Sequence, residues 1–453
     1  MTDDLQRSAH ELAADIARKA LSPVELIAAT LARIEADNAR LNAICARLDA
    51  QAMAAAHAAE AAVMAGDPIG PLHGVPVVIK EITPMAGIRC TYASVVYADH
   101  FADSDALVVA RLKAAGAIIV GRSNASEFGA GAHTVNPLFG ATCNPHDVKR
   151  TAGGSTGGGA VALQAGMAAL AEGTDLGGSL RIPAAFCGVC GLRPTPGRVP
   201  VVPSPQPWDD LNTEGPMARN CTDLALMLDV LSGAAPSAPL SAGRAASACF
   251  SRLPDARALR LAYAPDPSGL GCDQTIGTSC AAAAASLGAT PIALDLSPLR
   301  QAFLTLRGLW MLREHHQRLH LRDQFGPNLR GNIEHGLSLS ARDIAEAEAV
   351  RADALDRLVR VFEDVDVLLC PTTAVSPFPI DWNHPQTING QPLGHYIEWA
   401  APTYVFSALG VPALSVPCGV DDDGLPVGLQ IVARPWCEAD ALAVGVWLET
   451  LTT

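Results

Sequence analysis

Two serines in this chain lie in glycine-rich turns, where their hydroxyl groups could act as nucleophiles. Ser155 belongs to the run GGSTGGG and Ser179 ends the run GTDLGGS, both between Arg150 and Pro200. Glycine tolerates positive φ angles and lets backbone N–H groups approach a ligand closely. The small residues between the serines predict one helix, from Gly158 to Leu170. Two such turns flanking a helix indicate a site built largely from backbone.

The second turn could hold a negative charge. Its consecutive N–H groups can point at one spot, which is the geometry of an anion nest. If Ser179 attacks a carbonyl, the nest becomes an oxyanion hole. A phosphate-binding loop is the alternative, although neither G-x-x-x-x-G-K-[ST] nor a strand-borne G-x-G-x-x-G is found. The expected oxyanion donors are the backbone N–H groups of Leu176, Gly177, Gly178 and Ser179.

The first turn offers a competing nucleophile. The run GGSTG matches G-x-S-x-G, the nucleophile elbow of α/β-hydrolases, in which Ser155 would attack and a later Asp and His would complete a triad. This pattern is short, and the chain contains 39 glycines. We therefore favour Ser179, and a serine esterase that uses Ser155 stays as an alternative.

A lysine ends a predicted buried strand. Lys80 follows the apolar run VPVVI, and such a run is typical of a strand covered on both faces. A lysine carried into the interior must pair with an acid or give up its proton, because burial disfavours the charged form. The alternative is an ordinary lysine whose charged end reaches solvent from the end of the strand.

The stretch from Arg150 to Pro200 closely resembles the signature region of the amidase signature family, GGSSGGS and then GTDxGGSIRxPAAFCGxxGLKPTxGR. The run GVPVVIKE also resembles that family's GxPxxxKD motif. The resemblance implies that Ser179 is the nucleophile, that Ser155 is a proton-relaying serine held on a cis peptide, and that Lys80 is the catalytic lysine. Signature residues expected to support them are Thr174, Asp175 and Arg181. The chain departs from the family pattern at Glu81, Thr156, Gly159, Leu180, Arg193 and Ser407.

The residue types define a chemistry. A serine hydroxyl needs a base, and no histidine lies in the signature-like stretch. Lys80 can be that base only when neutral, so its pKa must lie well below ~10.4. Ser155 would take the proton of Ser179, pass its own to Lys80 and later return one to the leaving nitrogen. We expect an acyl-enzyme on Ser179 and cleavage of an amide-type C–N bond, with no metal or organic cofactor.

Small and aromatic residues are the candidates for the substrate pocket. No basic cluster lies in the stretches concerned, which predicts neutral substrates: aryl amides (anilides), carbamates (urethanes), or both. The resemblance, which extends to aryl acylamidases and urethane-cleaving enzymes, is consistent with this class. The alternative is that the aromatics only pack loops onto the body of the protein. The candidates are Gly129, Ala130, Gly131, Ala132, Phe139, Trp208, Met85 and the segment Tyr396-Ile397-Glu398-Trp399.

Two other functions stay open. The family includes the glutaminase partner in tRNA-dependent amidotransferase complexes, but the Tyr-rich helix of that branch corresponds here to residues 306–314, which contain no Tyr. A free-standing enzyme is therefore favoured. The glycine turns could instead belong to a nucleotide-binding or metal-binding protein. His316 and His320, four residues apart on a predicted helix, could bind zinc, although no third ligand is spaced to join them.

Composition narrows the partners and the compartment. The chain has 453 residues, 49% of them hydrophobic, and a net charge of −14. That charge gives no attraction to nucleic acid or to anionic membranes, so we expect a small-molecule amide or carbamate partner. The N-terminus lacks a signal-peptide core and no long apolar run occurs, which predicts a cytoplasmic protein. The 12 scattered cysteines are expected to be buried thiols.

Alternating strand and helix patterns predict an α/β protein. The resemblance implies a mixed, mostly parallel β-sheet sandwiched between α-helices, in a single domain over residues 1–453. Within it we expect an N-terminal helical segment (1–66), a catalytic core (67–232), a variable βα insertion (233–300) and the C-terminal part of the core (301–453). The proline-rich loop 201–215 is a candidate lid. We expect a monomer or homodimer.

Overall fold

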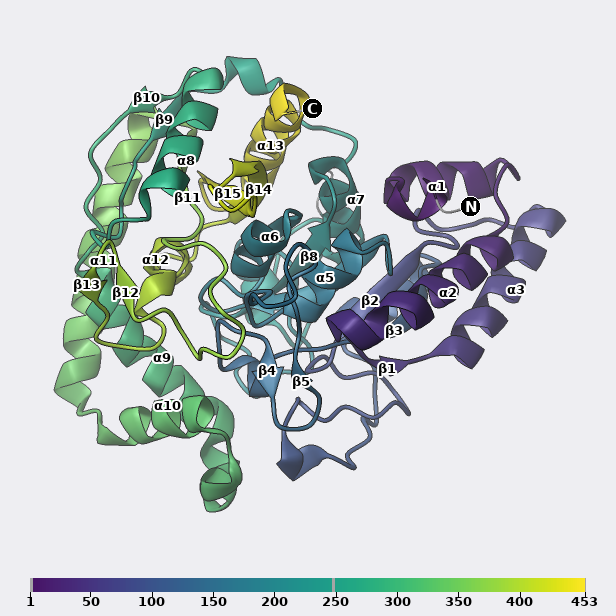
Figure 1. Ribbon diagram of the computed structural model, residues 1–453, viewed down its shortest axis with the longest axis horizontal. Coiled ribbons are helices and arrows are strands. Elements are labelled where there is room, and N and C mark those ends of the chain that lie inside the picture. Colours follow the sequence, from purple (N-terminus) through teal and green to yellow (C-terminus); the bar gives the residue numbers. More distant parts are fainter. Residues whose placement is uncertain (1–2, 247–248, 453) are drawn as a thin grey trace.

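The computed structural model describes residues 3–246 and 249–452, and its centre is one eleven-stranded sheet (Figure 1). Strands from both ends of the chain share this sheet, which is consistent with a single domain. In order across the sheet, the strands are β1 (Ile44–Arg47), β3 (Ile118–Ser123), β2 (Pro76–Lys80), β6 (Leu170–Asp175), β8 (Thr213–Ala218), β7 (Cys190–Arg193), β14 (Ala413–Val420), β15 (Pro426–Ala433), β11 (Val367–Pro371), β9 (Leu261–Tyr263) and β10 (Thr290–Pro291).

The sheet is mixed, as expected. Its parallel pairings lie in two groups near the edges, β3–β2–β6 and β11–β9–β10. The strands between them, together with the edge strand β1, pair antiparallel. Two short hairpins stand apart, β4 (Val135–Asn136) with β5 (Gly140–Ala141) and β12 (Thr387–Ile388) with β13 (Gln391–Pro392). The predicted α/β class is confirmed.

Alternate residues of a strand point to opposite faces of the sheet, and helices cover both of these faces. In β2, Val77 and Ile79 pack with the cluster that holds α1, α4, α7, α8 and α13, whereas Val78 packs with α2, α3, α5 and α6. Around β11, α9, α11 and α12 cover the second face. The helices are α1 (Ala9–Ala17), α2 (Pro23–Leu41), α3 (Asp49–Ala65), α4 (Leu107–Ala114), α5 (Gly157–Gln164), α6 (Arg181–Cys187), α7 (Cys221–Leu231), α8 (Gln274–Ser286), α9 (Leu299–His315), α10 (Pro327–Ser338), α11 (Ala341–Asp364), α12 (Ala401–Ala408) and α13 (Glu438–Thr452).

The segment between the two serines is shorter in helix than predicted. Helix α5 ends at Gln164 rather than at Leu170. Gly166 has a φ of +71°, a left-handed conformation that glycine adopts readily and that ends the helix. Leu170 instead begins β6, which runs down to Asp175 and delivers the second turn. The serines are thus held by a helix and a strand, not by one helix.

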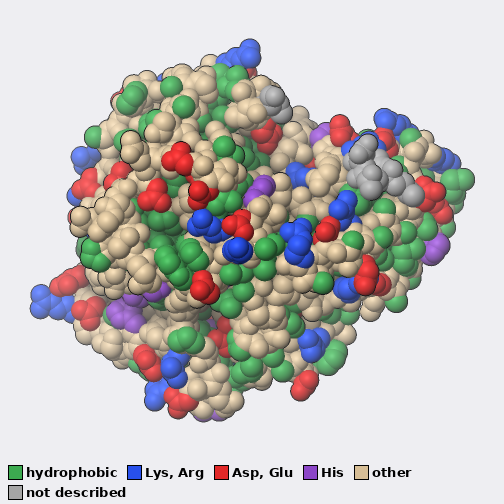
Figure 2. Space-filling view, in the orientation of Figure 1, with side chains coloured by type: hydrophobic (Ala, Val, Ile, Leu, Met, Phe, Trp, Pro, Cys, Tyr) green, Lys and Arg blue, Asp and Glu red, His purple; other side chains and the backbone are tan. Residues whose placement is uncertain are grey.

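The surface of the chain carries charges of both signs. On the face shown in Figure 2, basic and acidic side chains are interspersed. Among the residues that the structure describes, no helix has both the length and the apolar character needed to cross a bilayer.

Candidate active site

Strand β2 carries Lys80 into the interior, where its side chain is fully buried. The Nζ atom lies 2.8 Å from Ser155 Oγ and 2.8 Å from Thr156 Oγ1. A third hydroxyl, Thr174 Oγ1, lies 2.9 Å away. Lys80 therefore does not reach solvent at the strand end, and three hydroxyl groups surround its amine.

Burial lowers the pKa of Lys80 to about 7, although the nearby Glu172 and Asp175 carboxylates oppose the shift. Neither carboxylate lies within 4.0 Å of Nζ in the described residues, so the amine has no direct ionic partner. Glu172 accepts a hydrogen bond from the backbone N–H of Lys80 instead, at 3.1 Å. A lysine with this pKa is present as the neutral amine in a large fraction of molecules near neutral pH.

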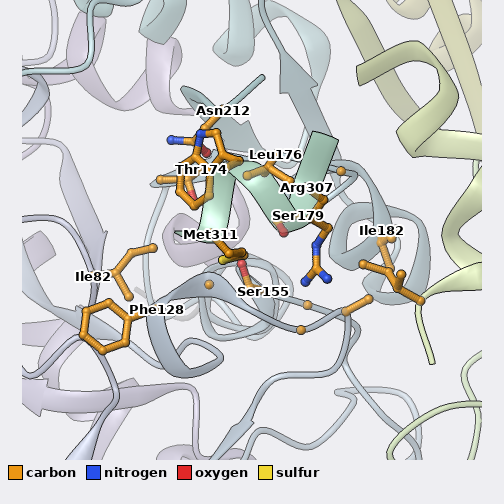
Figure 3. Close-up of a pocket in the computed structure, with 17 residues that line it drawn as sticks. Ile82, Phe128, Ser155, Thr174, Leu176, Ser179, Ile182, Asn212, Arg307 and Met311 are labelled. Carbon is orange, nitrogen blue, oxygen red and sulfur yellow. The ribbon is translucent and has the colours of Figure 1, made fainter. Parts of the chain in front are cut away.

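Ser155 and Ser179 face the same cavity from two different elements (Figure 3). Ser155 stands just before α5, after a Gly154–Ser155 peptide that is cis, as the resemblance implies. Ser179 stands in the turn between β6 and α6 and is half-buried. Gly129 leaves room beside them, because a Cβ atom there would lie 3.4 Å from Ser155 Oγ. Lys80 therefore contacts Ser155, and Ser155 in turn lines the cavity.

The turn before Ser179 is tied to the chain's own carboxylate. Asp175 accepts hydrogen bonds from the backbone N–H groups of Gly178, at 2.8 Å, and Leu180, at 3.2 Å. The expectation that Gly178 donates to an oxyanion is wrong, because its N–H is already used. Among the described residues, no acceptor is found for the N–H groups of Leu176, Gly177 and Ser179, whose residues line the cavity.

Buried arginines fix that turn in place. Arg181 and Arg193 both face Asp175, with the nearer guanidinium nitrogen 2.9 Å from a carboxylate oxygen. Burial alone would raise the pKa of Asp175, but the two guanidinium groups outweigh it and hold the pKa below its ordinary value. One of the four expected donors, the N–H of Gly178, is thus occupied by a carboxylate of the chain itself, which disfavours a phosphate loop.

Two of the departures from the family pattern have structural roles. Ser407 Oγ accepts a hydrogen bond from Arg181 at 2.6 Å. Glu81 points away from the cavity and pairs with the buried Arg122 at 3.1 Å. It also accepts from the N–H and hydroxyl of Thr91. Both residues support the framework around the site.

The cavity is small, about 70 Å³, and its walls are partly those predicted. Gly129, Gly131 and Ala132 line it, but Ala130 does not and packs against Phe325 and its neighbours instead. Ile397, from the predicted segment 396–399, lines it as well. The wall residues that were not predicted as such are Ile82, Phe128, Gly154, Thr174, Ile182, Asn212, Arg307, Trp310 and Met311.

The aromatic candidates do not line this cavity. Trp399 is 1% exposed and stacks on Phe186 in the core, 5.8 Å between ring centroids. Trp208 is 70% exposed on the loop surface. Phe139 lies near Arg89, outside the cavity. Tyr396 contacts Arg307 from behind the wall, with the Arg307 guanidinium carbon 5.5 Å from the centre of its ring.

Met85 also lies elsewhere, in a groove beside α3 and β3. For Met85 and the aromatic candidates, the alternative to a pocket role was right: their side chains pack loops or lie on the surface. The aromatic wall residues, Phe128 and Trp310, come from a short turn and from α9.

Helix α9 supplies residues that the sequence reasoning missed. Arg307, Trp310 and Met311 all line the cavity. The absence of a basic cluster from the predicted loop stretches therefore did not exclude a basic residue at the cavity, because Arg307 comes from α9. The spacing of Phe303, Arg307 and Trp310 places an arginine on an otherwise apolar helix face, and this pattern could have revealed it.

The histidine alternative fails on geometry. Helix α9 ends at His315, and residues 316–324 form a 3₁₀ helix, in which positions four apart do not share a face. His316 and His320 are exposed. Within the described residues, three possible metal ligands lie within reach of one another at Cys190, Cys221 and Glu449, none of which lines the cavity.

Comparison with known proteins gives a concordant result. The amidase family model matches residues 25–442. The chain belongs to the amidase signature family. An acylamidase of Rhodococcus erythropolis is 36% identical over 443 residues, covering 94% of this chain and 91% of the relative. A glutamyl-tRNA(Gln) amidotransferase component of Moorella thermoacetica is 33% identical, covering 98% of this chain and 96% of the relative.

Solved structures agree. A bacterial aryl acylamidase of the amidase signature family superimposes with a TM-score of 0.90 at 28% identity, covering 98% of this chain and 96% of that one. The protein is therefore an amide hydrolase of this family.

Proposed function

We propose that the protein cleaves amide-type C–N bonds through an acyl-enzyme on Ser179, with Ser155 as proton relay and Lys80 as base. The observation that carries this proposal is the 2.8 Å contact between Lys80 Nζ and Ser155 Oγ, in a cavity that Ser179 also lines. It assigns Ser155 a basic partner, which a relaying serine requires. His133, the histidine packed against Gly154, has both ring nitrogens bonded elsewhere, to Thr151 and Ile380.

The proton path follows from the contacts. Neutral Lys80 accepts the Ser155 proton while Ser155 takes the proton of Ser179, whose oxygen attacks the carbonyl carbon. The N–H groups of Leu176, Gly177 and Ser179 stabilise the oxyanion that forms. When the tetrahedral intermediate collapses, Ser155 returns a proton to the leaving nitrogen. Water then repeats the sequence on the acyl-enzyme and releases the acid.

We propose that the substrates carry an aryl group on nitrogen, as anilides or aryl carbamates. Apolar side chains dominate the cavity wall, including Ile82, Phe128, Trp310 and Met311, and an apolar wall suits an aryl group. An aniline also leaves more readily than an alkylamine. The acylamidase relative and the aryl acylamidase structure support this class.

The second candidate is the glutaminase component of a tRNA-dependent amidotransferase, because components of glutamyl-tRNA(Gln) amidotransferases are also more than 30% identical to the chain. The experiment compares kcat/KM of the purified chain for a nitroanilide, an N-aryl carbamate and glutamine. We expect both aryl substrates to exceed glutamine. A larger kcat/KM for glutamine would favour the amidotransferase function.

Substitution of each serine separates the two possible nucleophiles. Ser179→Ala should abolish turnover of the nitroanilide, because the bond-making oxygen is lost. Ser155→Ala should cost several orders of magnitude but leave residual activity, since water can replace the relay. The esterase alternative predicts the reverse, an active Ser179→Ala variant and a dead Ser155→Ala variant.

A further inference from the structure

Arg307 presents a buried positive charge to the cavity that holds Ser179. It lies in α9, its side chain is 2% exposed, and it is a wall residue of that cavity. In Figure 3 its guanidinium group is directed toward the space beside Ser155 and Ser179. An arginine stays protonated in proteins, so this charge is permanent.

Arg307 differs from the other fully buried arginines. Arg122 pairs with Glu81, and both Arg181 and Arg193 pair with Asp175. For Arg307, no carboxylate oxygen lies within 4.0 Å of a guanidinium nitrogen in the part of the chain that the structure describes. Burial of a charge without a counter-charge is unfavourable. Among these fully buried arginines of the described chain, Arg307 is the one without a carboxylate partner, and it lines the cavity.

The surroundings hold the guanidinium group without neutralising it. Arg307 donates a hydrogen bond to Asn332 Oδ1, and Asn332 donates in turn to the Tyr396 hydroxyl at 2.8 Å. The Tyr396 ring lies under the guanidinium carbon at 5.5 Å. His395 is nearby, and burial followed by the charge of Arg307 lowers its pKa to about 4, so it is neutral at neutral pH. Glu398, whose charge acts on His395, pairs with Arg300 at 3.6 Å.

We propose that Arg307 binds a carboxylate of the substrate, so that the preferred amides are anionic rather than neutral. This proposal rests on the proposed function and names its substrate class more closely. A guanidinium group matches a carboxylate with two parallel N–H···O bonds, and a substrate carboxylate would supply the missing counter-charge. Because Arg307 and Ser179 line the same cavity, we expect the carboxylate to lie a short distance from the scissile bond.

The test uses matched pairs of anilides that differ only in charge. 4-Anilino-4-oxobutanoate carries the carboxylate on the acyl side, and 4-methylpentananilide replaces it by an isopropyl group. 4-Acetamidobenzoate and 4-isopropylacetanilide form the same pair on the amine side. We measure release of the aniline by the natural chain. For at least one of the two acids, we expect a kcat/KM about 10-fold or more above that of its neutral partner. Faster cleavage of both neutral partners would overturn the proposal.

Variants then assign the preference to Arg307. Arg307→Gln should lower the acid-to-neutral ratio of kcat/KM about 100-fold, the usual effect of losing a charge-assisted pair, and Arg307→Lys should lower it less. Arg300→Gln, on the same helix but outside the cavity, is the matched control and should leave the ratio unchanged. A ratio within about 3-fold of the natural chain's in Arg307→Gln would contradict the proposal.

A binding measurement separates failure of this proposal from failure of the proposed function. Calorimetry with Ser179→Ala protein measures binding of the two acids without turnover. We expect binding that Arg307→Gln in the same background abolishes. Arg307-dependent binding without amide cleavage by the natural chain would sink the proposed function alone. Cleavage of neutral anilides without Arg307-dependent acid binding would sink this proposal alone.

Discussion

Lys80 can act as a base because three hydroxyl groups surround its amine and no carboxylate contacts it in the described residues. Burial lowers its pKa to about 7. The neutral, proton-accepting form prevails above that pH, so kcat/KM should rise with pH through about 7 and then level off. The measurement is a pH–rate profile on a nitroanilide. The rise should be missing from the residual activity of Lys80→Ala.

A metal-dependent base gives a different result in the same assay. Treatment with EDTA should leave the rate unchanged, because the proton path uses side chains alone. Loss of activity in EDTA that zinc restores would contradict the role of Lys80.

Residue chemistry was the part of the site most accessible from sequence. The glycine turns pointed to Ser155 and Ser179. The family resemblance assigned Lys80, for which the strand pattern alone left an ordinary lysine as the alternative. The structure brings Lys80 and Ser155 into contact and both serines to one cavity. The state of Gly178 could not be predicted, because its N–H donates to a carboxylate three residues away that pairs with Arg181 and Arg193 in the fold. Arg307 was missed although its place on an otherwise apolar helix face could be read from the sequence. The sequence did not show that this face meets the cavity.

At the scale of elements, the turn between β6 and α6 depends on one buried carboxylate. Asp175 bonds the backbone of the turn and balances Arg181 and Arg193. Asp175→Asn leaves two buried guanidinium groups uncompensated, so the free energy of unfolding should fall by about 3–5 kcal/mol. Urea denaturation measures this change. An unchanged midpoint and slope would show that the ion pairs do not stabilise the turn.

The tryptophan that lines the cavity comes from α9 rather than from the loop before β8, which contributes Asn212. Trp310 lines the cavity and donates a hydrogen bond to Asp209 of that loop at 2.7 Å, whereas Trp208 is 70% exposed. Trp310→Ala should lower kcat/KM for an anilide about 10-fold or more, by loss of aryl contact. Trp208→Ala is the matched aromatic control and should stay within about 2-fold. A larger loss in Trp208→Ala would instead support a lid that closes over the substrate.

Element boundaries were predicted less well than element types. The strand ending at Lys80 and the βα unit before α9 occur close to the expected positions. The helix after Ser155 was drawn six residues too long, because the small residues up to Leu170 suit a helix and a buried strand equally well. The aromatic residues of the loops were wrongly assigned to the pocket, because the local sequence did not show which of them lie in the core and which lie on the surface.

At the scale of the whole molecule, the order of the strands in the sheet could not be predicted from the sequence pattern. Strand β2 lies beside β6 although about ninety residues separate them, and no local periodicity records such a pairing. That arrangement brings Lys80 to the turns that carry both serines. The family resemblance implied the fold, and the α/β class that it implied is confirmed.

The most direct test of the account is to trap the acyl-enzyme. The protein is mixed with a nitrophenyl carbamate, whose carbamoyl-enzyme hydrolyses slowly, and is then digested for peptide mass spectrometry. We predict one carbamoyl group per chain, on Ser179, with release of one equivalent of nitrophenol in a burst. A carbamoyl group on Ser155, or steady product release with no labelled serine, would contradict the central role of Ser179.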